Sequence, residues 1–150
     1  MKTIVLASRN KHKEVEIKKL FEGTGIQVKG LSNFPGIPEV EEDGETLEEN
    51  ALIKARKIFN YIHLPVISDD TGLEVFALDM APGVYSARYS GKNAVYEDNN
   101  RKLLRAMKKV AREKRGARFR CVSAFVTEKI EHITEGICKG RIIEEKTGKV

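Results

Sequence analysis

Cysteine and histidine are scarce in this 150-residue sequence, and their scarcity limits the kinds of site that it can build. The two cysteines, Cys121 and Cys138, stand in segments typical of strands, and the three histidines are scattered at positions 12, 63 and 132. These spacings match no zinc-binding motif. We therefore interpret both cysteines as reduced, core or half-buried thiols of a cytosolic protein.

Long hydrophobic runs, internal repeats and low-complexity tracts are absent too. No apolar run approaches the roughly 20 residues that cross a bilayer. The apolar block at residues 4–7 is too short for a signal peptide and predicts a buried strand instead. The sequence also has no Gly-x-x-x-x-Gly-Lys pattern, which argues against a P-loop nucleotidase. We expect a cytoplasmic protein with no membrane partner.

Charge is unevenly distributed. The 27 Lys and Arg residues exceed the 22 Asp and Glu residues and give a net charge of +5, which favours anionic partners. Acidic residues concentrate at 39–49 and at Asp69-Asp70, whereas basic residues dominate 11–19 and 101–120. This segregation suits a metal and phosphate site in basic surroundings, and it equally suits two solvated helix faces and an acidic loop.

Apolar blocks and helical periodicity alternate through the first two thirds of the chain. Asn10 is the predicted N-cap of the first helix, and Thr46 with Glu49 has the form of a capping box before the second. Asp69-Asp70-Thr71-Gly72 predicts a turn at the end of a strand. The predicted strands are 4–7, 27–31 and 66–68, and the predicted helices are about 10–21, 47–62 and 94–114.

The last third predicts a β-hairpin. Side chains along 118–127 alternate between two faces, Phe119, Cys121, Ser123 and Phe125 on one and Arg120, Val122, Ala124 and Val126 on the other. Residues 133–143 form a second β-rich run, and the turn is expected near Lys129. Strands interleaved with helices early and a hairpin late predict an α/β fold, with a mixed twisted sheet and flanking helices.

The first candidate site is the segment Ser8-Arg9-Asn10-Lys11-His12-Lys13. Lys11 and Lys13 fall in the first turn of a helix, whose N-terminus is already electropositive. A phosphate bound to the backbone N–H groups and the ammonium groups would relieve this conflict. The alternative is that both lysines are solvated at a small energetic cost.

The second candidate is a set of carboxylates, Glu41, Glu42 and Asp43 in a loop and Asp69-Asp70 after a strand. Mg²⁺ usually takes one or two carboxylates, keeps several waters and bridges substrate phosphates. A remaining carboxylate could act as general base on water. The alternative is a plain Asp-rich turn. A third candidate, residues 82–91, has glycines and an arginine, Arg88, that could hold a phosphate or contact another subunit.

Four ordered motifs resemble the RdgB/inosine-triphosphatase family of non-standard purine nucleotide pyrophosphatases. The N-terminal segment resembles its T/S-x-N-x-x-K loop, and Asp69-Asp70-Thr71-Gly72-Leu73 resembles its D-D-S/T-G-L signature. Residues 41–55 resemble its acidic loop and helix, and 81–89 its P-G-x-x-S-A-R segment. The resemblance implies an inosine-triphosphatase-like (Maf-like) architecture and a homodimer.

The resemblance also implies a reaction and residue roles. The reaction is Mg²⁺-dependent hydrolysis of ITP, dITP or XTP to the monophosphate and pyrophosphate, which cleanses the nucleotide pool. Glu41 and Asp70 would hold Mg²⁺, with Glu42 as the alternative to Glu41, and Asp70 would activate water. The residues that would bind substrate are Ser8, Arg9, Asn10, Lys11, His12, Lys13, Lys54 and Thr71, with Asp69 in support.

Members of that family continue, after the strand that matches Ile142-Ile143, into a G-F-G-Y-D-P loop and an S-H-R segment that recognise the base. Neither occurs in these 150 residues. We expect one pyrophosphatase domain over residues 1–150 without the family's C-terminal portion, and apolar surface exposed as a result.

Two other functions compete with this one. A Maf-like pyrophosphatase shares the Leu-Ala-Ser opening, but a Ser-x-Arg-Arg continuation is lacking after Ser8. A non-catalytic nucleotide- or nucleic-acid-binding module would use the basic helix around 101–115, and salt-sensitive binding would support it. Nucleic acid is the less expected partner.

Overall fold

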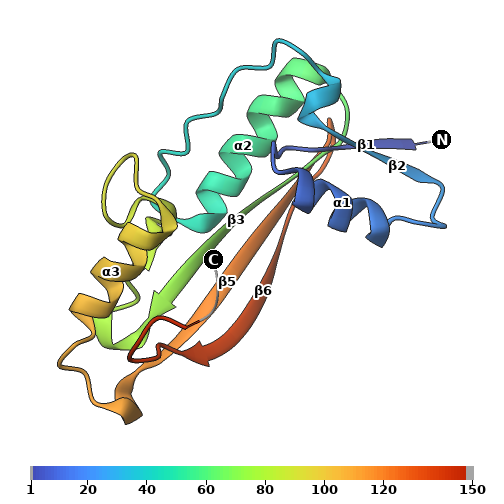
Figure 1. The fold of residues 1–150 in the computed structure, drawn as a ribbon. Helices are drawn as coiled ribbons and strands as arrows, with labels where there is room; N and C mark the ends of the chain where they lie inside the picture. The colour runs from blue at the N-terminus through green and yellow to red at the C-terminus, as the bar shows by residue number, and fades with distance from the viewer. Residues whose placement is uncertain (1, 148–150) are drawn as a thin grey trace. The chain divides into compact units, whose positions relative to one another are not determined.

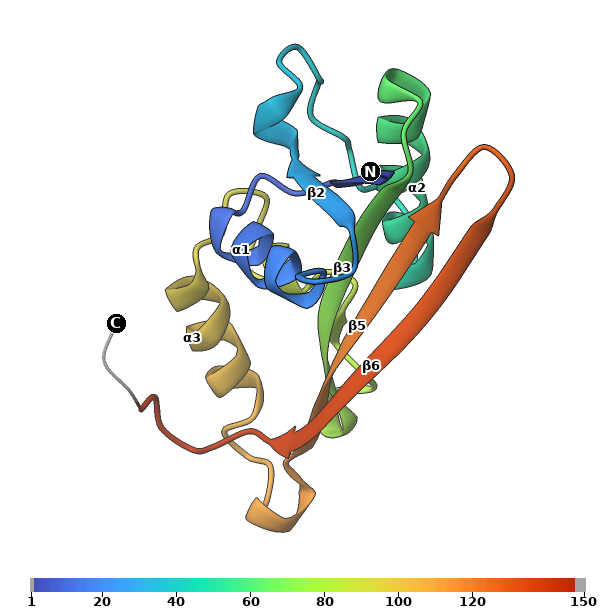
Figure 2. The ribbon, with the colours of Figure 1, turned by 90° about the vertical axis from the view of Figure 1, so that its right-hand side faces the viewer.

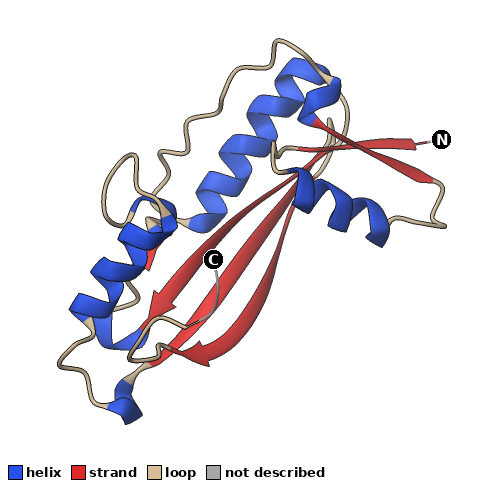
Figure 3. Ribbon diagram, viewed as in Figure 1, coloured by secondary structure: helices blue, strands red, loops and turns tan. Residues whose placement is uncertain are grey.

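The structure, a computed structural model, describes residues 2–147 and has the predicted α/β fold. Its sheet has the strand order β2-β1-β3-β5-β6, with the short β4 paired to β3 (Figure 1). Figure 3 separates the helices from these strands by colour. The strands are β1 (Lys2–Leu6), β2 (Ile26–Gly30), β3 (Val66–Val75), β4 (Pro82–Gly83), β5 (Gly116–Val126) and β6 (Glu131–Arg141). The α-helices are α1 (Lys11–Leu20), α2 (Leu47–Ile62) and α3 (Tyr96–Ala106).

The sheet is mixed, as predicted. Strand β1 pairs in parallel with β2 and with β3, whereas β3 and β4 are antiparallel. Strands β5 and β6 run in opposite directions as the two arms of a hairpin (Figure 2). Within residues 2–147, no helix combines the length and the apolar character needed to cross a membrane.

Internal contacts divide the chain into two compact units. Among the described residues, the first unit comprises 2–70 and 122–134, and the second comprises 71–121 and 135–147. Each unit is described by itself below. The expectation of a single domain over residues 1–150 stays a prediction.

The first unit is built around β1, which is buried because residues 4–7 are apolar on both faces of the strand. Helices α1 and α2 lie on opposite sides of β1 and β3 (Figure 2). Helix α2 turns Ala51, Ala55 and Ile58 into the core, and its small alanines allow close approach to the sheet. The Ser68 hydroxyl of β3 donates a hydrogen bond to the Ala51 carbonyl, which fixes the helix to the strand.

Both predicted helix caps are confirmed. The Asn10 carboxamide accepts hydrogen bonds from the backbone N–H groups of residues 12 and 13. The Thr46 hydroxyl accepts one from the Glu49 N–H at 3.1 Å. In a capping box the Glu49 carboxylate would accept from the N–H of the N-cap, Thr46. Here it accepts instead from the N–H of the preceding residue, Glu45, at 2.7 Å.

An exposed ion pair joins α2 to the start of β6. The Arg56 guanidinium donates to both carboxylate oxygens of Glu131, at 2.7 and 2.6 Å. These hydrogen bonds lower the pKa of Glu131 and raise that of Arg56. Because both side chains are solvated, the pair contributes little to stability.

The second unit has its own small core of Val75, Leu103, Met107 and Ala117. A buried arginine, Arg115, borders it and is only 4% exposed. Its guanidinium donates to four carbonyl oxygens, those of Met107 at 2.6 Å, Val110 at 3.2 Å, Ile142 at 2.8 Å and Ile143 at 2.9 Å. The charge is therefore buried among carbonyl dipoles that satisfy it.

The predicted turn at Asp69-Asp70-Thr71-Gly72 is wrong, because these residues continue β3 to Val75. Turn propensity is local, whereas the pairing of β3 with its neighbours in the sheet satisfies this stretch of backbone. Pairing with β4 aligns Leu73 with Gly83 and Glu74 with Pro82.

The predicted helix over 94–114 is too long, because α3 ends at Ala106 and a short 3₁₀ turn follows at Arg112–Lys114. The Arg115 guanidinium accounts for this end, since it occupies the Met107 and Val110 carbonyls. The basic helix of the nucleic-acid alternative is correspondingly shorter.

Two further side chains differ from expectation. Cys138 is exposed, not buried or half-buried, because every residue of β6 is exposed. Cys121 is half-buried, as predicted. Leu20, the last residue of α1, is apolar and yet 74% exposed. Exposed apolar residues such as Phe119, Ile137 and Ile143 agree with the expected apolar surface.

Arg115→Leu should lower the free energy of unfolding by about 2–4 kcal/mol, because it leaves buried carbonyl groups without donors. Arg112→Leu is the matched control, since Arg112 is exposed nearby, and should change stability by less than about 0.5 kcal/mol. Urea unfolding followed by circular dichroism measures both. Equal midpoints for the two variants would contradict the structural role of Arg115.

Candidate phosphate and metal site

The N-terminal loop is shaped by its own polar side chains. The Ser8 hydroxyl accepts a hydrogen bond from the Asn10 N–H at 3.1 Å. The Asn10 Oδ1 atom accepts from the His12 and Lys13 N–H groups, at 2.9 and 3.2 Å. Asn10 therefore already occupies two N–H groups that a phosphate at the helix N-terminus would use. A phosphate at this helix N-terminus would therefore depend mainly on side-chain ammonium groups.

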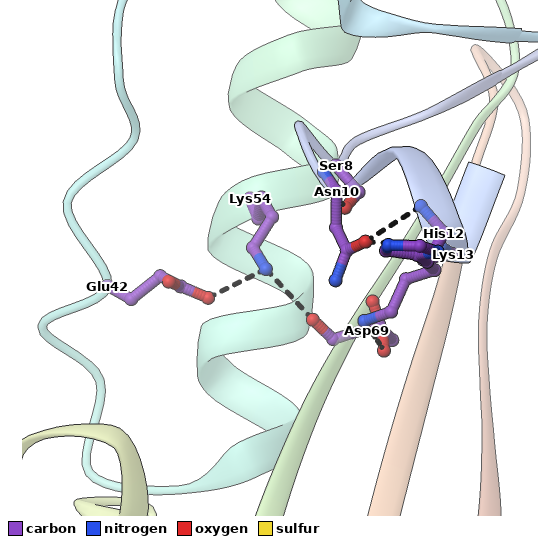
Figure 4. A network of polar contacts seen from close by, with 7 residues as sticks. All are labelled: Ser8, Asn10, His12, Lys13, Glu42, Lys54 and Asp69. Carbon is purple, nitrogen blue, oxygen red and sulfur yellow. Dashed lines mark hydrogen bonds and ion pairs between the residues drawn. The ribbon is translucent and has the colours of Figure 1, made fainter. Parts of the chain in front are cut away.

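Lys13 supplies one such ammonium group. Its Nζ atom lies 2.6 Å from the Asp69 Oδ2 atom, and the two side chains are 36% and 14% exposed (Figure 4). A lysine in the first turn of a helix is unfavourable by itself. The carboxylate of Asp69 relieves that conflict within the protein, since its negative charge compensates the Lys13 ammonium group as the oxygens of a bound phosphate would.

Lys54 supplies the second ammonium group and connects two segments. Its Nζ atom lies 2.8 Å from the Glu42 Oε1 atom and donates to the Asp69 carbonyl oxygen at 2.9 Å. Figure 4 shows Lys54 reaching from α2 toward both partners, with Asn10 and Lys13 close by. One ammonium group thus connects β3 to the segment 41–46 before α2, which we call the acidic loop.

Asp70 lies on the α2 side of β3. Side chains alternate along a strand, so Asp70 shares a face with Ser68, two residues earlier. Ser68 faces α2, because its hydroxyl bonds the Ala51 carbonyl. The Asp70 Oδ2 atom is shielded from solvent. Asp70, Lys54 and Glu42 therefore belong to one side of the sheet, whereas the alternation directs the Asp69 side chain to the other.

The other predicted site residues lie outside this network. The Arg9 guanidinium donates to the Ile37 carbonyl oxygen at 2.8 Å, and Lys11 and His12 are exposed in the first turn of α1. Thr71 is exposed on β3, in the second unit. Glu41 is exposed, whereas its alternative, Glu42, is half-buried and forms the ion pair with Lys54.

The donors present fit a magnesium ion held mostly by water and substrate. Across residues 2–147, no three His, Cys, Asp or Glu side chains gather into a metal-binding group. Mg²⁺ does not require such a group, since one or two carboxylates and substrate phosphates suffice. Asp70 and Glu42 supply hard oxygen ligands on one side of β3, next to an ammonium group that could bind phosphate.

The loop at 82–91 has a structural role that the sequence did not indicate. The Ser86 hydroxyl donates to the Gly83 carbonyl at 2.6 Å and accepts from the Leu73 N–H at 2.8 Å, which anchors the loop to β3. The Arg88 guanidinium lies 5.1 Å from the centre of the Tyr85 ring, within cation–π distance. Arg88 thus packs on its own loop.

The fold is that of an α/β protein, and the site is a network of lysines and carboxylates. The chain belongs to the Ham1 family, whose model matches residues 4–150. This finding confirms the resemblance that the four motifs carry.

Relatives and solved structures agree with this membership. The chain is 45% identical over 146 residues to a dITP/XTP pyrophosphatase of Thermoanaerobacter sp. (strain X514), covering 97% of this chain and 74% of that protein. It is 47% identical over 149 residues to a dITP/XTP pyrophosphatase of Geobacter sulfurreducens, covering 99% and 75%. A HAM1 protein structure from Coxiella burnetii superposes with a TM-score of 0.92 at 39% identity, covering 100% and 77%.

Lys54→Met should loosen the acidic loop, because it removes the ion pair with Glu42 and the bond to the Asp69 carbonyl. We expect a loss of about 1–2 kcal/mol in stability and faster cleavage after Glu41 and Glu42 by a glutamate-specific protease. Lys57→Met, on the exposed face of the same helix, is the control and should leave both unchanged. Identical cleavage of the two variants would show that Lys54 does not hold the loop.

Proposed function

We propose that this chain hydrolyses non-standard purine nucleoside triphosphates, ITP, dITP and XTP, to the monophosphate and pyrophosphate. The observation that carries the proposal is the network of Lys13, Lys54, Asp69 and Glu42, which offers ammonium groups for phosphate beside the Glu42 carboxylate for a metal. The 45% identity to a dITP/XTP pyrophosphatase supports the choice of substrate class.

Magnesium is the metal that we propose. When bound, it would neutralise charge on the triphosphate and polarise a phosphoryl oxygen. We propose Asp70 and Glu42 as its protein ligands. Glu42 is preferred to Glu41 because it is half-buried and already faces Lys54, whereas Glu41 is exposed.

The two lysines would bind the triphosphate. Each ammonium group now contacts a carboxylate, Lys13 that of Asp69 and Lys54 that of Glu42. Phosphate oxygens can replace these carboxylates as hydrogen-bond acceptors, and a carboxylate released in this way can turn to a cation. Ser8 and Asn10 would then shape the loop beneath the phosphates, and Arg9, Lys11, His12 and Thr71 would have peripheral contacts.

Asp70 is the proposed general base. It would accept a proton from the water that attacks phosphorus, while a phosphoanhydride bond breaks and pyrophosphate leaves. Its Oδ2 atom is shielded from solvent, which favours a fixed orientation of the carboxylate over a freely rotating one. A homodimer, which the family resemblance implies, and a cytoplasmic location, expected from the composition of the sequence, complete the proposal.

Asp70→Asn should lower pyrophosphate release from dITP by about 10²–10⁴-fold, because it removes a proton acceptor and a metal ligand but almost no volume. Asp79→Asn is the matched control, since Asp79 is exposed in the left-handed region, where Asn is tolerated, and should retain activity. Circular dichroism should show both variants folded. Turnover by Asp70→Asn equal to wild type would exclude Asp70 as the base.

A further inference from the structure

Asn50 is a buried amide in the apolar stripe of α2. It is only 2% exposed and is buried beside Leu47 and Ala51. A buried amide costs free energy unless its polar atoms form hydrogen bonds. The Asn50 Oδ1 atom accepts one from the Gly44 N–H at 2.7 Å, and Gly44 belongs to the acidic loop. The amide therefore connects the helix to that loop.

Gly44 lies too close to α2 for any side chain. A Cβ atom at this position would come within 2.6 Å of the Asn50 Oδ1 atom and 2.8 Å of the Glu49 Cβ atom. Contacts under about 3 Å require one of the groups to move, and here a helix backbone stands behind them. Because Gly44 has no side chain, its backbone can lie directly against the buried amide of Asn50. This close contact sets the path of the loop.

Lys54 forms a second contact between α2 and the acidic loop, from the same face of the helix as Asn50. Asn50 and Lys54 are four residues apart and so project from the same side of α2. Lys54 binds the Glu42 carboxylate at 2.8 Å, two residues before Gly44. Two bonds at this spacing leave the carboxylate of Glu42 little freedom to move relative to Lys54 and the Asp69 carbonyl.

We propose that Asn50 is a positioning residue for hydrolysis, which holds the acidic loop at Gly44 so that the Glu42 carboxylate stays at the phosphate and metal site. The inference rests on the proposed function. Asn50 accepts the bond from the Gly44 N–H, so it acts through the backbone of the loop. Displacement of a reacting group by about 1 Å can cost up to 10²-fold in rate, which is large enough to measure.

The test compares Asn50→Ala with Asn50→Asp and Asn60→Ala. Asn50→Asp keeps an oxygen acceptor for the Gly44 N–H, and the N-terminal region of the helix favours its negative charge. Asn60→Ala removes an exposed amide from the same helix and serves as the control. Hydrogen exchange of the Gly44 amide, measured by NMR, reports the loop, and steady-state hydrolysis of dITP reports the reaction.

We expect Asn50→Ala to speed exchange of the Gly44 amide at least about tenfold and to lower kcat by about 10- to 100-fold. The KM for nucleotide should change by less than about threefold, because the phosphate-binding lysines remain. Asn50→Asp should restore most of the exchange protection and of kcat. Asn60→Ala should match wild type in all three measurements.

Two results would overturn the inference. Gly44 exchange that is the same in Asn50→Ala and wild type would show that the amide does not hold the loop. Faster exchange with an unchanged kcat would show that the loop position is irrelevant to hydrolysis. If the wild-type chain releases no pyrophosphate, the proposed function fails and the kinetic role of Asn50 fails with it, while Gly44 exchange still decides separately whether Asn50 holds the loop.

Discussion

The site depends on the Lys54 ammonium group, which joins the acidic loop to the central strand β3. It binds the Glu42 carboxylate at 2.8 Å and the Asp69 carbonyl at 2.9 Å. The Lys54 side chain is 20% exposed, so solvent screens this pair less than a surface pair. Its carbonyl acceptor also offsets part of the cost of removing the charge from water. Through these two contacts, Lys54 connects the acidic loop, helix α2 and strand β3 to one another.

The carboxylates and lysines of the network balance one another in charge. Lys13 faces Asp69 and Lys54 faces Glu42, so the described network is neutral pair by pair. In the proposed function, the triphosphate would bring anionic oxygens for the two lysines, and Mg²⁺ would bring a cation for the Glu42 carboxylate. In the absence of ligand, pairing each lysine with a carboxylate avoids a partly buried charge without compensation.

Local sequence signals predicted the parts of the fold that local interactions stabilise. The Asn10 cap, the Thr46 cap and the hairpin near Lys129 depend on residues within a few positions of one another, and all three are confirmed. The alternation of side chains along β5 predicted two faces but not which of them is buried, and the structure buries Val122 and Ala124.

Long-range contacts decided the rest, which the sequence could not indicate. Asp69-Asp70-Thr71-Gly72 has strong turn propensity, yet pairing in the sheet makes it a strand. Helix α3 ends at Ala106, and Arg115, which follows the 3₁₀ turn, donates to the Met107 carbonyl just past that end, which a longer helix would use itself. The ion pair that makes Glu42 the proposed ligand in place of Glu41 joins residues 12 positions apart, and the sequence alone did not indicate it. Asn50 did leave a signal, a polar residue inside the apolar stripe of an otherwise regular amphipathic helix.

Pyrophosphate release by the purified 150-residue chain is the most direct test of the proposed function. The assay compares dITP, ITP and XTP with ATP and GTP, each with and without Mg²⁺, in protein shown to be folded. The proposed function predicts Mg²⁺-dependent release that is faster for the three non-standard nucleotides. No release from any nucleotide, with the fold intact, would contradict the proposed function and favour a non-catalytic binding module.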